Sequence, residues 1–304
     1  MNGPALVGLD IGGTKTHVRV ETPDGRRLAD AVHPSEDWAA EPVDVAAQWI
    51  AAVVERHRPP GATVAAIGAG AQGCDTEAHC VALGHALTSA AGVPSVVTND
   101  AALLVPAAGL STGIGVIAGT GSIAVAVGRA QDGAALRFAG GWGWVIGDEG
   151  SAPALVREAV RAALTRNDAG GPPDVLLPVL LEAFGVASAT GLARTVNDNT
   201  DAAHWASRAP AVFAAAERGS ADARAVITAG GESLAGLVGV LLAGGTTTTD
   251  VVAAGGVMTG QPSLFAAFRD AVGRAHPGLT VHLLHEPPVA GALALARRAA
   301  QPLS

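Results

Sequence analysis

The chain has 304 residues, of which 49% are hydrophobic and 15% charged, and its formal net charge is -8. This length fits two domains of ordinary size or one large α/β unit, and the composition excludes a mostly disordered chain. The acidic balance argues against nucleic-acid binding, which needs clustered Lys and Arg. The two cysteines, Cys74 and Cys80, are too few for a disulfide framework or a four-thiolate metal site. We therefore expect a reduced, cytoplasmic setting.

The mean hydropathy of +0.35 raises the question of a membrane protein. The most continuous apolar stretch, residues 234–243, is much shorter than the roughly 20 residues that a membrane span needs. Asp10 interrupts the first apolar run, and no basic stretch precedes that run, so we expect no signal peptide. These features predict a soluble protein that does not enter a membrane.

The first part of the chain predicts a meander of strands followed by alternating helices and strands. Residues 5–11 predict a buried strand, and strands at 16–20 and 26–32 follow it after turns, which makes the group antiparallel. Apolar residues at helical spacing predict a helix over 43–54. A strand at 63–68, a helix near 76–90, a strand at 95–98 and a helix beginning at Asp100 complete this half.

The same order starts again near residue 115. Strands are predicted at 115–118, 123–128 and 136–139, with a glycine-rich turn between the first two. After them come helices at 151–165, 174–183, 202–217 and 221–243, a strand at 250–254, a helix at 262–275, a strand at 279–284 and a helix at 289–300. Strand, turn, strand, strand thus occurs twice, which suggests two related halves that face each other across a boundary near residue 110.

Two glycine–threonine turns are candidates for binding phosphate. The first is Gly12-Gly13-Thr14, followed by Lys15, the only lysine in the chain. Glycines leave room for backbone N–H groups to converge on an anion, and Asp10 just before the turn could hold Mg²⁺ through water. The alternative is an ordinary hairpin turn. A second turn, residues 119–122, stands in the corresponding place of the second half, so the two could grip a polyphosphate from both sides.

Asn99 and Asp100 end a short strand and begin a helix. A carboxylate at the carboxyl edge of a strand lies where α/β folds place their ligands. Taken alone, the motif is explained better by a helix N-cap, a role that Asp often serves.

Two further glycine-rich segments carry weaker signals. Residues 140–151 combine many glycines with Trp142, Trp144 and Asp148, a set that could cover a sugar ring and accept its hydroxyl protons. The alternative is a turn whose tryptophans fill the core and whose Asp148 caps the next helix. Residues 253–257 follow a strand, and Gly255 and Gly256 there would let a nucleoside approach the backbone.

One competing motif points to a different cofactor. Residues 68–73 match the Gly-x-Gly-x-x-Gly fingerprint of dinucleotide-binding folds, after a strand and before a helix. That fingerprint also expects an acidic residue about 20 positions later for the ribose, and no Asp or Glu occurs between Glu77 and Asp100. The nicotinamide interpretation also leaves the other turns unexplained.

Taken together, the motifs resemble the superfamily of sugar kinases, heat-shock chaperones and actin. More narrowly, they resemble its N-acetylglucosamine kinase branch, which shares a family with the BadF-type ATPases. The most specific part is Gly-Gly-Trp-Gly, three residues, then Gly-Asp-Glu-Gly-Ser-Ala, over residues 140–152. The resemblance implies an α/β fold of two ribonuclease-H-like, actin-like ATPase lobes around a nucleotide cleft. It implies a first lobe of residues 1–110, with the terminal helix 289–304 packed back on it, and a second lobe of residues 111–288.

The resemblance also implies an ATP- and Mg²⁺-dependent kinase for the 6-hydroxyl of an amino sugar, with Asp100 as general base and Asp10 in the magnesium shell. The family implies a homodimer. The residues implied to bind ATP are Gly12, Gly13, Thr14, Lys15, Thr120, Gly121, Ser122, Gly255 and Gly256. Those implied to bind the sugar are Glu36, Trp38, Gln72, Asn99, Asp100, Gly141, Trp142, Gly143 and Asp148.

The chain departs from the family pattern beside the sugar. N-acetylglucosamine kinases often carry Asn-His-Trp where this chain has Glu36-Asp37-Trp38, and an Asn at the position of Ile123. Glu36 could instead face a free ammonium, which leaves glucosamine, N-acetylglucosamine and other hexoses open as substrates. The zinc-binding cysteine cluster of the ROK kinases is missing. A BadF-type activator of a partner enzyme is the alternative function, although Cys74 and Cys80 precede the proposed base, where they look misplaced for an iron–sulfur cluster.

Overall fold

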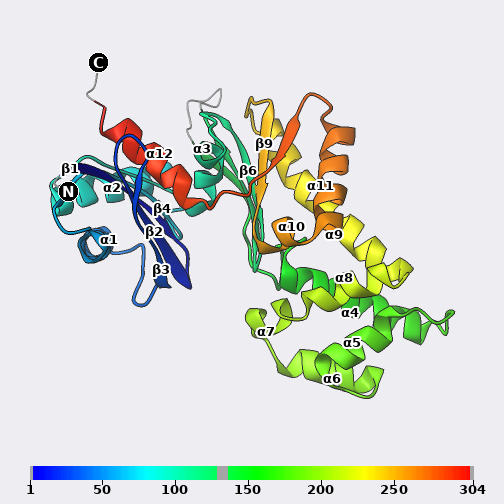
Figure 1. Ribbon diagram of the computed structural model, residues 1–304. Coiled ribbons are helices and arrows are strands. Elements are labelled where there is room, and N and C mark those ends of the chain that lie inside the picture. The colour runs from blue at the N-terminus through cyan, green and yellow to red at the C-terminus, as the bar shows by residue number, and fades with distance from the viewer. Residues whose placement is uncertain (1–2, 129–135, 302–304) are drawn as a thin grey trace.

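The computed structural model describes residues 3–128 and 136–301, which form two lobes, each built on a five-stranded mixed sheet (Figure 1). In the first sheet the strand order is β3-β2-β1-β4-β5, and in the second it is β10-β9-β6-β7-β8. Read in the opposite direction, the second order is β8-β7-β6-β9-β10. When the strands are numbered from the start of each half, both sheets therefore have the order 3-2-1-4-5. The predicted α/β fold and the internal repeat are therefore confirmed.

The first sheet begins with the predicted antiparallel meander and continues in parallel. Its strands are β1 (Gly3–Ile11), β2 (Lys15–Glu21), β3 (Arg27–Pro34), β4 (Ala62–Ala71) and β5 (Ser95–Thr98). The second sheet repeats this plan with β6 (Gly113–Ala118), β7 (Ser122–Val127), β8 (Leu136–Gly140), β9 (Asp250–Ala254) and β10 (Thr280–Leu283). Both glycine–threonine turns are therefore the hairpin turns between the first two strands of their sheets.

The central strand β1 is covered on both faces. Its odd-numbered residues, from Ala5 to Ile11, share a core with the helices α1 (Val43–His57) and α2 (Glu77–Ala91). On the other face, Leu6 shares a core with Leu293 of the terminal helix α12 (Val289–Ala299). A Cβ added to Gly8 would lie 2.8 Å from Cγ of Leu293, so a glycine is needed for α12 to lie this close.

The helix α12 thus returns from the second sheet to pack on β1 and β4 of the first. Our lobe boundaries near residues 110 and 288 fall in the connections before β6 and before α12, and remain a proposal. Residues 1–2 and 302–304 of the assigned first lobe lie outside the described residues.

Most of the predicted helices are present, and one prediction is wrong. The single helix expected over 202–217 is two helices, α7 (Ala202–Ala206) and α8 (Ala209–Glu217). Pro210 lies in the first turn of α8, where its missing N–H costs least, and it would break a continuous helix. The remaining elements of this lobe are α4 (Ala152–Asp168), α5 (Leu176–Phe184), α6 (Ala189–Asp198), α9 (Ala221–Ala243), α10 (Gly256–Gly260) and α11 (Pro262–Ala275), of which α6 and α10 were not predicted.

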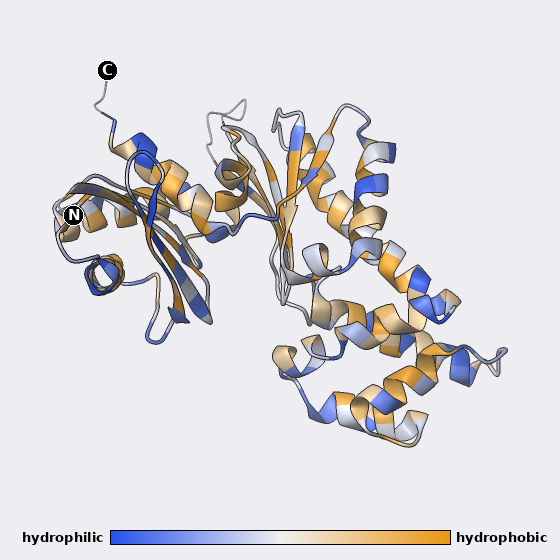
Figure 2. Ribbon diagram, in the orientation of Figure 1, coloured by the Kyte–Doolittle hydropathy of each residue, from blue (hydrophilic) through white to orange (hydrophobic). Residues whose placement is uncertain are grey.

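By length and composition alone, α9 is apolar enough to cross a membrane. In the structure it packs against α11, α4, α8 and the strands β7 and β8. Figure 2 shows hydrophobic residues along α9 and the strands beside it, and hydrophilic residues at its N-terminal end. The helix is therefore the central core helix of the second lobe.

Candidate functional site

The carboxyl ends of three parallel strands bring Asp10 and Asp100 to one edge of the first sheet. Asp10 of β1 is paired with Gly70 of β4, and Gly70 is paired with Thr98, the last residue of β5. Asn99 and Asp100 follow directly. This is the edge where open α/β sheets bind their ligands.

Asp100 begins the 3₁₀ helix η1 (Asp100–Leu103), which continues into α3 (Leu104–Ala107). The helix η1 contacts β1 and β4 of the first sheet and β6 and β7 of the second. A Cβ added to Gly70 would lie 3.0 Å from Cα of Asp100, so this glycine makes room for the start of η1. Asp100 is therefore placed at the junction of the two lobes.

The cap of η1 is Asn99, not Asp100. Oδ1 of Asn99 accepts the Ala101 N–H at 3.0 Å, and its Nδ2 donates to the Cys74 carbonyl at 3.2 Å and to Oδ1 of Asp75 at 3.1 Å. Oδ1 of Asp100 also lies 3.0 Å from the Ala101 N–H, while its second oxygen has no such bond among the hydrogen bonds of the described residues. The amide of Asn99, which is 2% exposed, is thus engaged within the protein, and its contact with substrate remains a prediction.

Both carboxylates are perturbed by burial. Burial raises the pKa of Asp100 to about 6, and the nearby charge of Asp75 adds to this rise while the hydrogen bond from Ala101 opposes it. Burial and then repulsion from Asp100 raise the pKa of Asp10 to about 7, and the cation of Lys15 partly offsets this. A carboxyl group with a pKa near neutrality is suited to accept a proton at working pH.

The first hairpin turn is held from two sides. The Gly12 N–H donates to the Lys15 carbonyl at 3.1 Å, and a Cβ added to Gly13 would lie 2.4 Å from Oε1 of Gln72. Thr14 and Lys15 are exposed and free to meet a ligand. The hydroxyl of Thr16, two residues after Thr14, is buried and lies 2.8 Å from the Ser35 hydroxyl, so it is not available to a phosphate.

The segment that carries Glu36 and Trp38 is fastened beside this turn. The Ser35 N–H donates to the Thr14 carbonyl at 3.0 Å, and Nε1 of Trp38 donates to the Gln72 carbonyl at 3.2 Å. The carbonyl of Glu36 accepts Nε1 of Trp49, while the residue itself is exposed. The structure therefore brings Glu36, Trp38 and Gln72 next to the first turn, as a group on one lobe.

The second hairpin turn lies between β6 and β7. The Gly119 N–H donates to the Gly121 carbonyl at 2.9 Å, and Thr120 at its tip is exposed. Ser122 is only 3% exposed, its hydroxyl donates to the Glu149 carbonyl at 3.0 Å, and its N–H donates to the Asp148 carboxylate. Both of its donors are thus engaged within the protein, and its contact with ATP remains a prediction.

Gly255 and Gly256 lie beside this second turn. Gly255 has φ +101°, and a Cβ there would lie 2.4 Å from the Ala118 carbonyl oxygen, at the end of β6. A Cβ on Gly119 would lie 3.7 Å from the Gly256 N–H nitrogen. The two glycine motifs of the second lobe therefore form one continuous surface.

Asp148 closes a loop that presses on the second turn. It has φ +55°, is 8% exposed, and its Oδ1 accepts the Gly143 N–H at 3.3 Å. A Cβ added to Gly121 would lie 3.0 Å from its Oδ2. Burial raises the pKa of Asp148, while hydrogen bonds from the Gly143 and Ser122 N–H groups lower it.

The structure answers two questions about this loop: whether Asp148 caps α4, and whether the two tryptophans belong to the core. The cap of α4 is Ser151, which accepts the Ala154 N–H at 3.4 Å, so Asp148 is not that cap. Trp144 packs 5.0 Å from the Trp205 ring and belongs to the core, whereas Trp142 is 76% exposed and is available to a ligand, as are Gly141 and Gly143.

The glycines of the dinucleotide-like motif serve packing. A Cβ on Gly68 would lie 2.0 Å from the Ala292 carbonyl oxygen of α12, and one on Gly70 would lie 2.4 Å from Cδ1 of Leu103. These glycines let α12 and η1 approach β4, which accounts for the motif without a dinucleotide.

Three residues near the site were not predicted as functional. Asp75 bonds Asn99 and raises the pKa of Asp100, and its position after a parallel strand was a usable signal. Cys74 supplies a carbonyl to Asn99. Arg157 lies behind the Asp148 loop, and nothing in its sequence surroundings indicates this. Within residues 3–128 and 136–301, no group of three or more His, Cys, Asp or Glu could hold a metal ion.

A family model described as the BadF/BadG/BcrA/BcrD ATPase family matches residues 7–295. An N-acetylmuramic acid/N-acetylglucosamine kinase of Clostridium acetobutylicum is 30% identical over 177 residues, which cover 56% of this chain and 57% of that protein. An N-acetyl-D-glucosamine kinase of Dictyostelium discoideum is 29% identical over 197 residues, covering 60% of this chain and 61% of that protein. The chain thus aligns with less than two thirds of the length of these curated relatives.

Solved structures match over nearly the whole chain. One from Chromobacterium violaceum, described as a candidate N-acetylglucosamine kinase, has a TM-score of 0.68 and 27% identity, and the match covers 98% of this chain and 99% of that one. A ROK family glucokinase of Streptomyces griseus, solved with glucose and AMPPNP, has a TM-score of 0.57 at 20% identity, covering 96% and 98%, and shows the fold alone. These neighbours agree with the actin-like arrangement of two lobes.

Proposed function

The chain belongs to the BadF/BadG/BcrA/BcrD ATPase family, and on this premise we propose that it is an ATP-dependent kinase for an amino-hexose, which transfers the γ-phosphoryl group to the 6-hydroxyl. The curated relatives named as N-acetylglucosamine kinases support a sugar as the acceptor. The observation that carries the proposal is Asp100, a partly buried carboxylate at the junction of two lobes that each present a glycine–threonine turn, with a raised pKa.

In this proposal Asp100 accepts the proton of the 6-hydroxyl as that oxygen attacks the γ-phosphorus. The base needs a pKa near working pH and a fixed position, and η1 supplies both because it removes Asp100 partly from solvent and packs on both sheets. Phosphoryl transfer depends mainly on alignment and on neutralisation of charge. Asp100 would also help to align the hydroxyl that it deprotonates.

The two turns would hold the polyphosphate from opposite lobes. Backbone N–H groups of Gly13 and Gly121 would face the phosphate oxygens, and the exposed hydroxyls of Thr14 and Thr120 would add donors. Gly12 and Ser122, whose N–H groups donate to Lys15 and Asp148, would shape the two turns. Lys15 is exposed directly after Thr14, and its cation would add a charge that favours the phosphates. Gly255 and Gly256, beside the second turn, would face the nucleoside.

Asp10 fits a magnesium ion held through water. Its carboxylate is partly buried and repelled by Asp100, and a divalent cation would relieve that repulsion. A carboxylate with ordered water offers the hard oxygen ligands that Mg²⁺ prefers. When bound, Mg²⁺ would neutralise charge on the phosphates of ATP.

The sugar would lie between the Asp148 loop and the segment that carries Trp38. Asp148 would accept hydroxyl protons, and the exposed face of Trp142 would cover the ring with Gly141 and Gly143 at its side. Trp38 and Gln72, bonded to each other, would form the opposite wall. Closure of the lobes would exclude water, which competes with the sugar as acceptor.

Glu36 would decide between a free and an acetylated amine. It is exposed beside Trp38, and a carboxylate favours the ammonium of glucosamine over a neutral N-acetyl group. We therefore expect Glu36→Gln to lower the ratio of kcat/KM for glucosamine to that for N-acetylglucosamine. An unchanged ratio would exclude Glu36 from this role.

The activator function of BadF-type proteins is disfavoured by the cysteines. Cys74 is 0% exposed and Cys80 is 3% exposed, both in the core of the first lobe, where they cannot present thiolates for an iron–sulfur cluster at a dimer interface. Iron analysis of anaerobically purified protein should find no stoichiometric iron. Their free, buried thiols also support the reducing, cytoplasmic location that we propose. We retain the homodimer as a proposal, and light scattering in solution tests it.

The experiment that tests the kinase is ADP release measured with glucosamine, N-acetylglucosamine, glucose, mannose and N-acetylmannosamine, with and without Mg²⁺. We expect Mg²⁺-dependent turnover to be fastest with one of the amino sugars, and a product whose phosphorus couples to the C6 protons in NMR spectra. No turnover with any hexose, or phosphate on another hydroxyl, would contradict the proposed reaction.

A further inference from the structure

We propose that Arg157 of α4 is a positioning residue that holds the Asp148 loop, residues 142–148, in the shape the sugar meets. The effect that we expect on the kinetics rests on the proposed function. Its structural consequence, an ordered loop, can be tested without any substrate.

The Asp148 loop needs an external support. It contains Gly143 and Gly147, and Gly143 and Asp148 both have positive φ, at +87° and +55°. Such a segment loses much conformational freedom when it is ordered. It is closed internally by the Gly147 N–H, which donates to the Gly143 carbonyl at 2.8 Å, and by the bond from the Gly143 N–H to Asp148.

Arg157 supplies the support from the helix beneath. Its Nη1 donates to the carbonyl of Trp144 and lies 3.5 Å from that of Gly147, so one nitrogen spans both arms of the loop. Its Nη2 lies 3.9 Å from Oε1 of Glu149, just after the loop. A planar guanidinium with several fixed donors is suited to collect carbonyls that converge in this way.

The same side chain acts on Asp148 in two ways. Gly147 directly precedes Asp148, so fixing its carbonyl fixes the backbone from which the carboxylate projects. The positive charge of Arg157 also lowers the pKa of Asp148 slightly, against the burial and the charge of Glu149 that raise it. Arg157 therefore favours both the position and the ionised form of the carboxylate that would accept the sugar hydroxyls.

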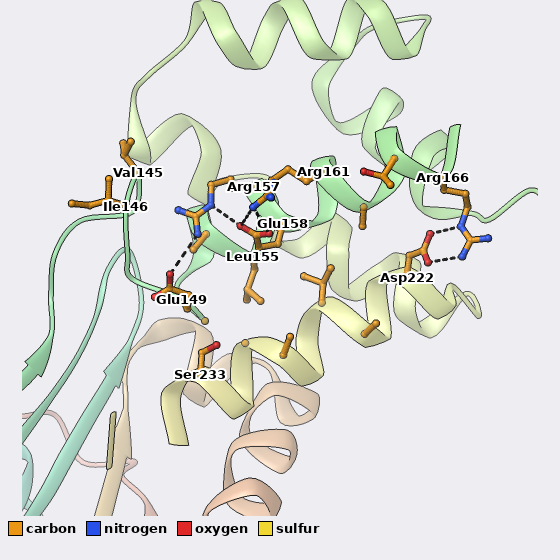
Figure 3. A pocket seen from close by; sticks show the side chains of 18 of the residues that line it. Val145, Ile146, Glu149, Leu155, Arg157, Glu158, Arg161, Arg166, Asp222 and Ser233 are labelled. Carbon is orange, nitrogen blue, oxygen red and sulfur yellow. Dashed lines mark hydrogen bonds and ion pairs between the residues drawn. The ribbon is translucent and has the colours of Figure 1, made fainter. Parts of the chain in front are cut away.

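The guanidinium is placed to act through the loop. It is 18% exposed and lines an open pocket of about 1070 Å³ between α4 and α9, which Val145, Ile146 and Glu149 also line (Figure 3). No residue that we assign to ATP lines this pocket. Arg157 thus lies on the face of the loop that borders this pocket, and reaches the sugar site only through the loop.

Arg161 provides a matched control one helical turn later. It lines the same pocket, and its Nη1 bonds Glu158 at 3.0 Å, as Nε of Arg157 does at 2.8 Å (Figure 3). Among the described residues, Arg161 has no hydrogen bond or ion pair with the loop. Replacing either arginine by Met removes one cation beside Glu158. Only the change at Arg157 removes the bonds to Trp144 and Gly147.

The first measurement is hydrogen exchange of the loop amides in the free protein. Losing charged hydrogen bonds of this kind corresponds to about 5- to 30-fold faster exchange over residues 142–148 in Arg157→Met, with no change in Arg161→Met. Arg157→Lys keeps the charge but cannot span both carbonyls, so we expect an intermediate value. Equal exchange in the two Met variants would overturn the proposal, whether or not the protein is a kinase.

The second measurement is steady-state kinetics with both substrates. Arg157→Met should lower kcat/KM for the sugar by about 10- to 100-fold and leave KM for ATP within about twofold, because only the sugar site depends on the shape of the Asp148 loop. Arg161→Met should match the wild type. A loss shared equally by the sugar and ATP would show general damage and refute a positioning role.

Discussion

Replacing Asp100 by asparagine should inactivate the protein and stabilise it at the same time. The pKa of Asp100 rises from an ordinary 3.8 to about 6, which corresponds to about 3 kcal/mol of unfavourable free energy in the folded state at neutral pH. Asparagine is similar in shape and can still accept the Ala101 N–H, but it carries no charge. Part of the gain is offset because an amide is also costly to bury, so we expect an increase of about 1–3 kcal/mol in the free energy of unfolding.

The sign of this effect depends on pH in a defined way. In the unfolded chain the carboxyl ionises near 3.8, and in the folded protein only near 6, so ionisation progressively destabilises the wild type as pH rises between these values. Asp100→Asn has no carboxyl group at this position to ionise, so its free energy of unfolding does not fall for this reason. The two proteins should therefore differ little at about pH 4 and most at about pH 8.

The assay is urea unfolding at both pH values, without nucleotide or Mg²⁺, together with ADP release at the higher pH. We expect kcat of Asp100→Asn to fall by at least about a hundredfold, the low end for losing a general base. Asp250→Asn is a control of opposite sign, because hydrogen bonds from His282 and Thr249 lower the pKa of Asp250, and its loss should destabilise the fold. Full activity in Asp100→Asn, or lower stability at the higher pH, would refute the argument from a buried base.

Three further outcomes follow from the structure. The kcat/KM for the sugar should fall about tenfold per pH unit below about 6, as Asp100 takes up a proton, and a profile flat down to about pH 5 would exclude it as the base. Trp142→Ala should raise KM for the sugar but change the free energy of unfolding by less than about 0.5 kcal/mol, because this side chain is exposed. Trp144→Ala should lower the free energy of unfolding by about 3 kcal/mol, because this side chain packs on the core. Equal losses of stability in the two variants, measured by denaturant unfolding, would contradict their different burial. Gly255→Ala should destabilise by more than about 2 kcal/mol, since its φ is +101° and a Cβ would lie 2.4 Å from a carbonyl oxygen; denaturant unfolding checks this, and a neutral change would contradict the packing of this turn.

The fold could be predicted largely because its signals are local. Both hairpin turns, the repeated strand order and most helix positions follow from turn residues and apolar spacing. The break between α7 and α8 was missed although Pro210 marks it. The helix α6 was missed because it is short and Leu192 is its only buried residue, so few apolar positions mark it in the sequence.

The site could be predicted in part, because strand ends and glycine turns mark where ligands meet the backbone. The division of roles between Asn99 and Asp100 was not predictable, since it depends on which side chain reaches the Ala101 N–H in three dimensions. The role of Arg157 depends on two backbone carbonyls, which every residue carries, so no residue type in the loop indicates it. Burial of Thr16 against Ser35 likewise follows from pairing between distant segments.

A crystal structure with a non-hydrolysable ATP analogue, Mg²⁺ and the preferred sugar is the most direct measurement. We predict that the β- and γ-phosphates lie between residues 12–14 and 119–122, with the acceptor hydroxyl at hydrogen-bond distance from Asp100. Phosphates bound elsewhere, or a sugar hydroxyl out of reach of Asp100, would contradict the account.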